Sequence, residues 1–155
     1  MARYSTNNRM GGTQQAITTT FKSQVSLAAA TATLMRGSVV DIDFGPDGAP
    51  NATDCAIVYD ISRLTSAGTA TAVVPVPIDN TTSAAGTVGQ ANFTAEPTVT
   101  AASSLYMIAL NQRASLRVFF DQGLRWPATN LNGLVFRALS PTYTGNVATT
   151  LFHDE

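Results

Sequence analysis

The sequence is short of reactive and charged side chains. In 155 residues it has one cysteine, one histidine and one tryptophan, and only 12% of the residues are charged, whereas roughly a quarter is usual for a globular domain. The single cysteine, Cys55, excludes an internal disulfide framework, and the chain has no cysteine and histidine cluster for zinc. So neutral a surface suits a protein that packs against copies of itself or against another scaffold better than a free enzyme.

Catalytic and phosphate-binding motifs are missing as well. His153 is the only histidine, and no serine or cysteine lies in a nucleophile elbow that could work with it. The glycines of RMGGTQQ and AAGTVGQ fit neither a P-loop nor a dinucleotide-binding fingerprint. We therefore expect no catalytic residue, no cofactor and no enzymatic activity.

A calcium-binding loop is incomplete in this chain. Asp41, Asp43 and Asp47 form a D-x-D-x-x-x-D run. An EF-hand counted from Asp41 would need an acid or amide at its fifth position and a glutamate at its twelfth, where this chain has Gly45 and Ala52. We predict a turn with solvated carboxylates and no metal site, and the sequence leaves open whether a cation of another kind binds these aspartates.

Long apolar runs do not occur either. No stretch reaches the 18 or so apolar residues of a membrane-spanning helix. The N-terminal segment lacks the apolar run and cleavage site of a secretory signal. We expect neither a membrane span nor secretion through a signal peptide.

Charge of one sign is missing from each of two neighbouring segments. Residues 1–40 contain four basic residues and no acid, and residues 41–60 contain five aspartates and no base. Four positive charges spread over this length are sparse for phosphate contacts, so direct nucleic-acid contact is the less favoured alternative. The basic segment is better interpreted as an arm that faces a protein partner.

What the chain does have is a series of short apolar runs separated by turn residues. The run from Lys22, KSQVSLAAATATLM, fits a helix or a strand, and we favour a strand because the later runs all look like strands. These later runs are SVVDIDF (38–44), CAIVYDISRL (55–64), TAVVPVPI (71–78), SLYMIAL (104–110), ASLRVFF (114–120), GLVFRAL (133–139) and NVATTLFH (146–153). Seven or eight short strands at this spacing predict an all-β fold, an antiparallel β-sandwich of jelly-roll-like kind.

The domain organisation follows from the same pattern. Residues 1–20 are polar and show no period, which predicts a flexible, extended N-terminal arm. Residues 21–155 then form a single β-sandwich domain. Pro75 and Pro77 predict an edge strand, because proline cannot donate to a β-ladder. Residues 79–104 are the longest irregular connection, which is typical of a functional or interface loop.

The stretch from Leu110 to Leu134 brings together several arginines and the only tryptophan. Guanidinium groups form bidentate pairs with carboxylates and are favoured with aromatic residues at interfaces. These arginines can pair with the aspartates of residues 41–60, either between strands or between subunits; a nucleic-acid groove is the alternative. We predict subunit contacts at Arg113, Arg117 and Trp126, and contacts of the arm at Arg3, Tyr4 and Arg9.

Several segments also carry a family resemblance. They are residues 44–80, ANFTAEPT (91–98), LNQRASLRVFF (110–120), GLRWPATNLNGLVFRALSPTYTG (123–145) and the final HDE (153–155). Together they resemble a family of small virion proteins from tailed bacteriophages, some of which have a role as capsid cement or decoration proteins. The resemblance covers roughly residues 20–155, and its most specific pieces are residues 60–65, 110–113 and 127–129. The apolar Val118-Phe119-Phe120 departs from the family pattern, which is more polar there or contains tryptophan.

This resemblance implies a structural, non-enzymatic role. Such proteins form β-sandwiches that commonly assemble as homotrimers on the outer surface of the capsid, between capsomers of the major capsid protein. Two alternatives stay open: a tail, neck or tail-tube component of the virion, and a carbohydrate-binding receptor module. The second alternative draws on the loops rich in threonine and asparagine and on Trp126.

Overall fold

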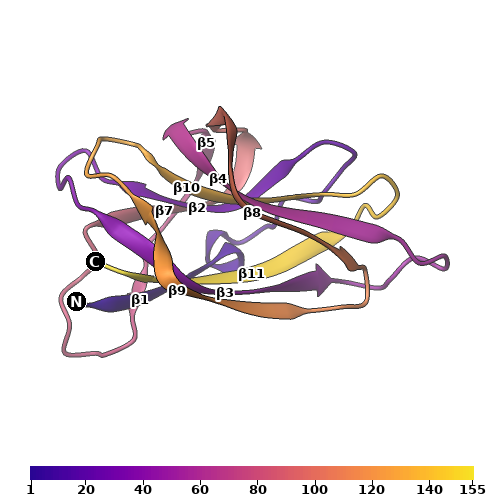
Figure 1. The fold of residues 1–155 in the computed structure, drawn as a ribbon, viewed down its shortest axis with the longest axis horizontal. Coiled ribbons are helices and arrows are strands. Elements are labelled where there is room, and N and C mark those ends of the chain that lie inside the picture. Colours follow the sequence, from indigo (N-terminus) through magenta and orange to yellow (C-terminus); the bar gives the residue numbers. More distant parts are fainter.

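Two antiparallel β-sheets pack face to face in the computed structural model, which describes residues 1–155 (Figure 1). The first sheet contains, in spatial order, β6 (Val76–Pro77), β1 (Arg3–Asn7), β11 (Asn146–Asp154), β3 (Gly37–Asp47) and β9 (Leu116–Trp126). The second sheet contains β5 (Thr69–Val73), β7 (Thr87–Ala95), β2 (Lys22–Ala29), β10 (Gly133–Leu139), β4 (Ala56–Ser66) and β8 (Thr98–Asn111). The only helix is the short 3-10 helix η1 (Asn8–Gly11). The predicted all-β sandwich is confirmed.

The strand order is that of a jelly roll. The chain changes sheet at every step from β1 to β4 and again at every step from β8 to β11. Two four-stranded sets result, β1-β11-β3-β9 and β2-β10-β4-β8, as in an eight-stranded jelly roll. The strands β5, β6 and β7 belong to the connection between β4 and β8, and they extend both sheets on the side of β1 and β2.

The core lies between the sheets and follows the two-residue alternation of the strands. In β11, for example, Val147 and Leu151 point inward and are buried, whereas Phe152 points outward. Three aromatic residues from both sheets meet at the centre. The ring centroid of Phe44 lies 4.6 Å from that of Tyr59 and 5.3 Å from that of Phe136. Tilted pairs at these distances add to the stabilisation from burial.

The N-terminal segment is not the predicted extended arm. Residues 3–7 form β1, which pairs with β11 on one side and with β6 on the other. Tyr4 is only 2% exposed, and its hydroxyl donates a hydrogen bond to the Ser83 carbonyl. The sequence did not reveal β1 as a strand, because polar residues occupy most of its positions and because its partner β11 lies at the other end of the chain. Figure 1 shows the two chain ends side by side.

The predicted irregular connection at residues 79–104 is also corrected. It contains β7 and the first part of β8. In β7 the inward positions are Thr87, Gly89, Ala91 and Phe93, all buried. Small and polar residues at three of these four positions give a weak hydrophobic alternation, so the sequence did not reveal a strand.

Other predictions of local structure are confirmed. The run that begins at Lys22 is the strand β2, and Val76–Pro77 forms the edge strand β6 of the first sheet. In β3 the alternation is interrupted by a register shift between Val39 and Asp41. Val39 therefore points into the core, although a strict two-residue alternation would place it on the outer face with Asp41 and Asp43. No helix of the chain has the length and apolar character needed to cross a membrane.

Candidate interaction surface

The outer face of the first sheet carries a set of ion pairs between neighbouring strands. Arg3 in β1 binds Asp154 in β11, with 2.7 Å between Nε and Oδ1. Arg117 in β9 makes a bidentate contact with Asp41 in β3, and its guanidinium also lies over the ring of Phe152 in β11. Strand alternation places all of these side chains on the same face, because the residues between them point into the core.

Most aspartates of residues 41–60 have an arginine partner within the chain. Asp47 pairs with Arg9, Asp54 with Arg113, Asp41 with Arg117 and Asp60 with Arg137, which leaves only Asp43 without one. Arg113, Arg117 and Arg137 therefore pair with the acidic segment between strands or turns of one molecule, whereas Arg125 has no carboxylate partner. Ion pairing between subunits is not needed to explain them.

These pairs differ strongly in their surroundings. Arg113 and Asp54 are both about half exposed, and such pairs contribute little to stability. Hydrogen bonds from Arg113 and Gln112 lower the pKa of Asp54, and the contact with Asp41 raises the pKa of Arg117. Asp60 is fully buried, and besides Arg137 it accepts hydrogen bonds from Ser62 and Ser104. Removal of one partner from a buried pair destabilises a protein strongly, because the other charge then stays buried without a partner.

Two of the predicted contact residues do not reach the surface. Tyr4 and Trp126 lie in the core on either side of His153, with ring centroids 5.4 Å and 5.8 Å from the imidazole. Trp126 is 1% exposed and His153 is fully buried. Neither aromatic residue can therefore contact a partner subunit while the sandwich is intact.

His153 contacts a buried carboxylate. Its Nε2 lies 3.4 Å from Oε1 of Glu155, and the carboxylate accepts hydrogen bonds from the backbone N–H groups of Gly86 and Thr87. Burial raises the pKa of Glu155, but the His153 contact and the donors around Gly86 and Thr87 outweigh it and lower the pKa to about 2. The arrangement holds a carboxylate in place. It does not resemble a nucleophilic triad, because neither ring nitrogen of His153 forms a hydrogen bond with a serine or a cysteine.

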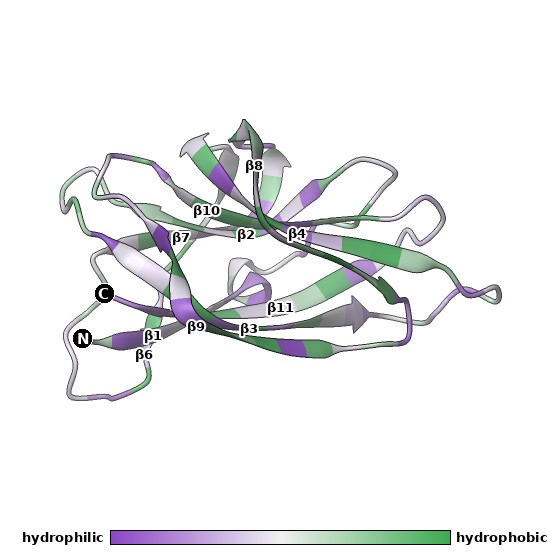
Figure 2. Cartoon of the chain, viewed as in Figure 1, coloured by the Kyte–Doolittle hydropathy of each residue, from purple (hydrophilic) through white to green (hydrophobic).

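One side of the sandwich is open, a feature that was not predicted from the sequence. The edge strands β8 and β9 lie next to each other there, one in each sheet, and the ring centroids of Tyr106 and Phe120 are 5.6 Å apart. Eight apolar side chains of these strands pack against the core but stay partly exposed: Leu105, Tyr106, Ile108, Leu110, Leu116, Val118, Phe120 and Leu124. Figure 2 shows a long hydrophobic stretch in β8 and shorter ones, interrupted by hydrophilic residues, in β9. Met107 and Phe119 on the outer faces are 53% and 67% exposed.

The opposite side of the sandwich is protected. Its edges are β5, with five residues, and β6, with two residues that include Pro77. Short strands and proline keep an edge from pairing with another chain. By contrast, β8 is 14 residues long and has no charged residue and no proline. A signal for the open side was therefore present in the sequence, as a long uncharged run from Thr98 to Asn111.

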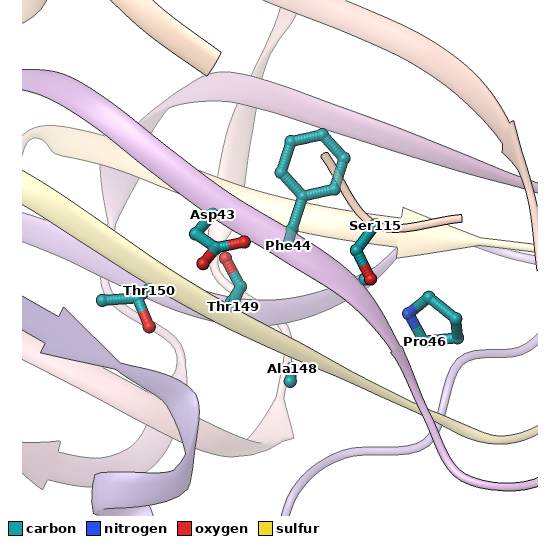
Figure 3. A pocket seen from close by; sticks show the side chains of 8 residues that line it. Asp43, Phe44, Pro46, Ser115, Ala148, Thr149 and Thr150 are labelled. Carbon is teal, nitrogen blue, oxygen red and sulfur yellow. The ribbon is translucent and has the colours of Figure 1, made fainter. Parts of the chain in front are cut away.

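A small hollow of about 150 Å³ lies over the ladder between β3 and β11 (Figure 3). Asp43, Ser115 and Thr150 line it with polar groups, and Phe44 points away from it into the core. Asp41 and Asp47 are occupied by arginines, so Asp43 is the only free carboxylate of the aspartate run. No group of three or more histidine, cysteine, aspartate or glutamate side chains comes together anywhere in the chain.

Comparison of the chain with protein-family models, with curated proteins and with solved structures gave no match. No functional residue can therefore be transferred from a relative. A functional proposal therefore rests on three features of this chain: an open apolar side at β8 and β9, a face with paired charges, and a protected opposite side.

Proposed function

We propose that this protein is a non-enzymatic structural protein of a bacteriophage virion, a capsid cement protein that binds between capsomers and stabilises the head shell. The observation that carries this role is the open side of the sandwich. There, two long edge strands leave backbone donors and acceptors unpaired, and eight apolar side chains stay partly exposed. Such a side is a template for contact with another chain.

The paired charges support the same role. Assembly is costly when it buries unpaired charges. Here β8 has no charge, and in the first half of β9 the only charged residue, Arg117, is already neutralised by Asp41. Contact at β8 and at Leu116–Phe120 of β9 would therefore bury apolar and hydroxyl groups at a low electrostatic cost, whereas Asp121 and Arg125 in the second half of β9 have no ion pair.

A cement protein works through many modest contacts. A standard interface buries roughly 800 Å² per partner, and several linked contacts raise the overall affinity without any new type of interaction. We propose that the protein forms homotrimers, whose subunits each touch the major capsid protein. A trimer that spans a junction between capsomers would then resist the outward pressure of packaged DNA.

Of the two alternatives, a tail, neck or tail-tube position uses the same open side in a different assembly. The carbohydrate-binding alternative is disfavoured because Trp126, the only tryptophan, is buried and cannot stack on a sugar. A tail component would form larger rings, since stacked rings and not closed trimers build a tube.

The test has two measurements on the full chain. Light scattering of the purified protein gives its native mass, and co-sedimentation with expanded head shells that lack the protein gives binding. A trimer that binds the shells and raises their heat resistance is the expected result. A large ring that does not bind shells would instead identify the tail alternative. A monomer without shell binding would contradict the proposed function.

A further inference from the structure

Three arginines of this chain have no carboxylate partner, and all three lie in one place. The chain has nine lysine and arginine residues. Six of them form ion pairs: Arg3, Arg9, Lys22, Arg113, Arg117 and Arg137. The remaining three, Arg36, Arg63 and Arg125, line a single hollow of about 740 Å³. Unpaired cations scattered at random over the surface would not be expected to meet in this way.

The three arginines come from separate parts of the fold. Arg36 precedes β3, Arg63 belongs to β4 of the second sheet, and Arg125 belongs to β9 of the first. A guanidinium nitrogen of Arg63 donates a hydrogen bond to the backbone carbonyl of Arg125 at 3.1 Å. This bond ties the two sheets together at the hollow. It uses one donor of Arg63, and the side chains of Arg36 and Arg125 make no hydrogen bond within the chain.

Three carboxylates also line the hollow, and two of them are engaged by other groups. Asp154 is bound to Arg3, and Glu155 accepts hydrogen bonds from backbone N–H groups. Asp121 accepts a hydrogen bond from the neighbouring amide of Gln122. The positive charge of the three arginines is therefore not cancelled by direct pairing, although Asp121 reduces it.

The hollow has the size and lining of a ligand site. Its volume falls within the roughly 300–1,000 Å³ of small-molecule sites. Val40, Trp126 and Pro127 contribute apolar atoms to its wall. Planar guanidinium groups bind carboxylate and phosphate oxygens in a bidentate way, and several of them together select ligands with more than one negative charge.

We propose that this hollow binds a small multivalent oxyanion, of the phosphate or polycarboxylate class, through Arg36, Arg63 and Arg125. Binding would add charge-assisted hydrogen bonds between segments of both sheets, and so would stabilise the fold. This site is independent of the proposed role in the capsid. Either one can fail without affecting the other.

The experiment is a titration of the full chain with inorganic phosphate and, separately, with citrate. Binding is followed by calorimetry and by the fluorescence of Trp126, which is the only tryptophan and lines the hollow. Sodium chloride is added to keep the ionic strength constant, because screening alone changes stability. Saturable binding of either anion is expected, and the comparison of the two shows which oxyanion class fits.

Three variants locate the site. Arg125→Gln and Arg36→Gln remove guanidinium groups that make no hydrogen bond in the chain, so both should fold. Each should weaken binding by about tenfold, the effect of losing one charge-assisted hydrogen bond. Arg113→Gln is the control. Arg113 is also exposed, but it is paired with Asp54 and precedes the first residue of β9, whereas Arg125 lies near the last. No saturable binding of either anion up to about 10 mM, tenfold above a weak Kd of about 1 mM, would overturn the site. An equal loss in Arg113→Gln would do the same.

Discussion

Arg137 binds Asp60 across the neighbouring strands β10 and β4, with 2.5 Å between Nε and Oδ2. The two residues lie directly opposite each other in the ladder, and the carboxylate is fully buried on the outer face of the second sheet. The guanidinium is covered in turn by Phe21, whose ring centroid is 4.5 Å from it. A charge-paired network thus replaces apolar packing in this part of the sheet.

Removal of one partner of this pair should destabilise the protein strongly. Asp60→Ala leaves Arg137 without its carboxylate and Ser62 and Ser104 without their acceptor. We expect a loss of about 3–5 kcal/mol in the free energy of unfolding, as for other buried pairs with one partner removed. Urea denaturation followed by circular dichroism measures it. Asp54→Ala is the matched control, and its exposed pair with Arg113 should contribute far less. Equal losses in both variants would show that the burial of Asp60 has no energetic effect.

Glu155 should make stability depend on acidic pH. Its pKa in the folded state is about 2, below its ordinary value of 4.5, so the folded state favours the ionised carboxylate. The stabilisation is complete above pH 4.5 and is lost as the pH falls toward 2, and it amounts to at most about 3 kcal/mol. The measurement compares the unfolding free energy of the wild type and Glu155→Gln between pH 6 and pH 2, a range that includes the ordinary and the folded-state pKa of Glu155. The difference between the two should shrink as the pH falls; a constant difference would refute the assignment.

Gly37 and Trp126 should be energetically coupled. A Cβ atom at Gly37 would overlap the six-membered ring of Trp126. Gly37→Ala should therefore cost about 1–3 kcal/mol, as for other overpacked cores. The smaller ring in Trp126→Phe should relieve this overlap, so the double variant should lose less stability than the sum of the two single losses. Thermal unfolding of the four proteins by circular dichroism gives the coupling energy, and strict additivity would contradict it.

Phe119 should contribute to self-association through the open side. It lies on β9 and is 67% exposed. Phe119→Ser should weaken assembly about tenfold or more, as expected for an aromatic residue within an interface, with little change in folding. Val74→Ser is the matched control, because Val74 is 70% exposed and lies between β5 and β6 on the protected side. Light scattering over a range of concentrations measures both variants. An effect of Val74→Ser alone would place the interface on the opposite side.

Substitutions at Tyr4 and Arg3 should show that the N-terminal residues belong to the sandwich. Tyr4 points into the core, whereas its neighbour Arg3 points outward. Tyr4→Ala should cost about 3–5 kcal/mol, as for a buried aromatic residue, and Arg3→Ala should have a much smaller effect. Thermal unfolding distinguishes the two. If residues 3–7 were a free arm, neither substitution would change the stability of the fold.

The sequence alone determined the strands that have a strong local alternation. Residues 116–120, 133–139 and 146–153 could be predicted as strands because their two-residue pattern of apolar and polar positions belongs to the segment itself. The charge pattern also predicted that arginines after residue 110 pair with the acidic segment at 41–60, but it left open whether they pair within one molecule, as Arg113, Arg117 and Arg137 do, or between subunits. These features depend on neighbours in the chain, which a sequence shows directly.

Tertiary structure decided which segments meet. β1 is a strand because β11 and β6 offer it hydrogen-bond partners from distant parts of the chain, and β7 is a strand although small residues fill its buried positions. Trp126 is in the core because Gly37, on the neighbouring strand, leaves space for its ring. Arg36, Arg63 and Arg125 share a hollow only because the two sheets bring β4, β9 and the residue before β3 together. Contacts of this kind join residues far apart in the chain, and no local pattern encodes the pairing and register that create them.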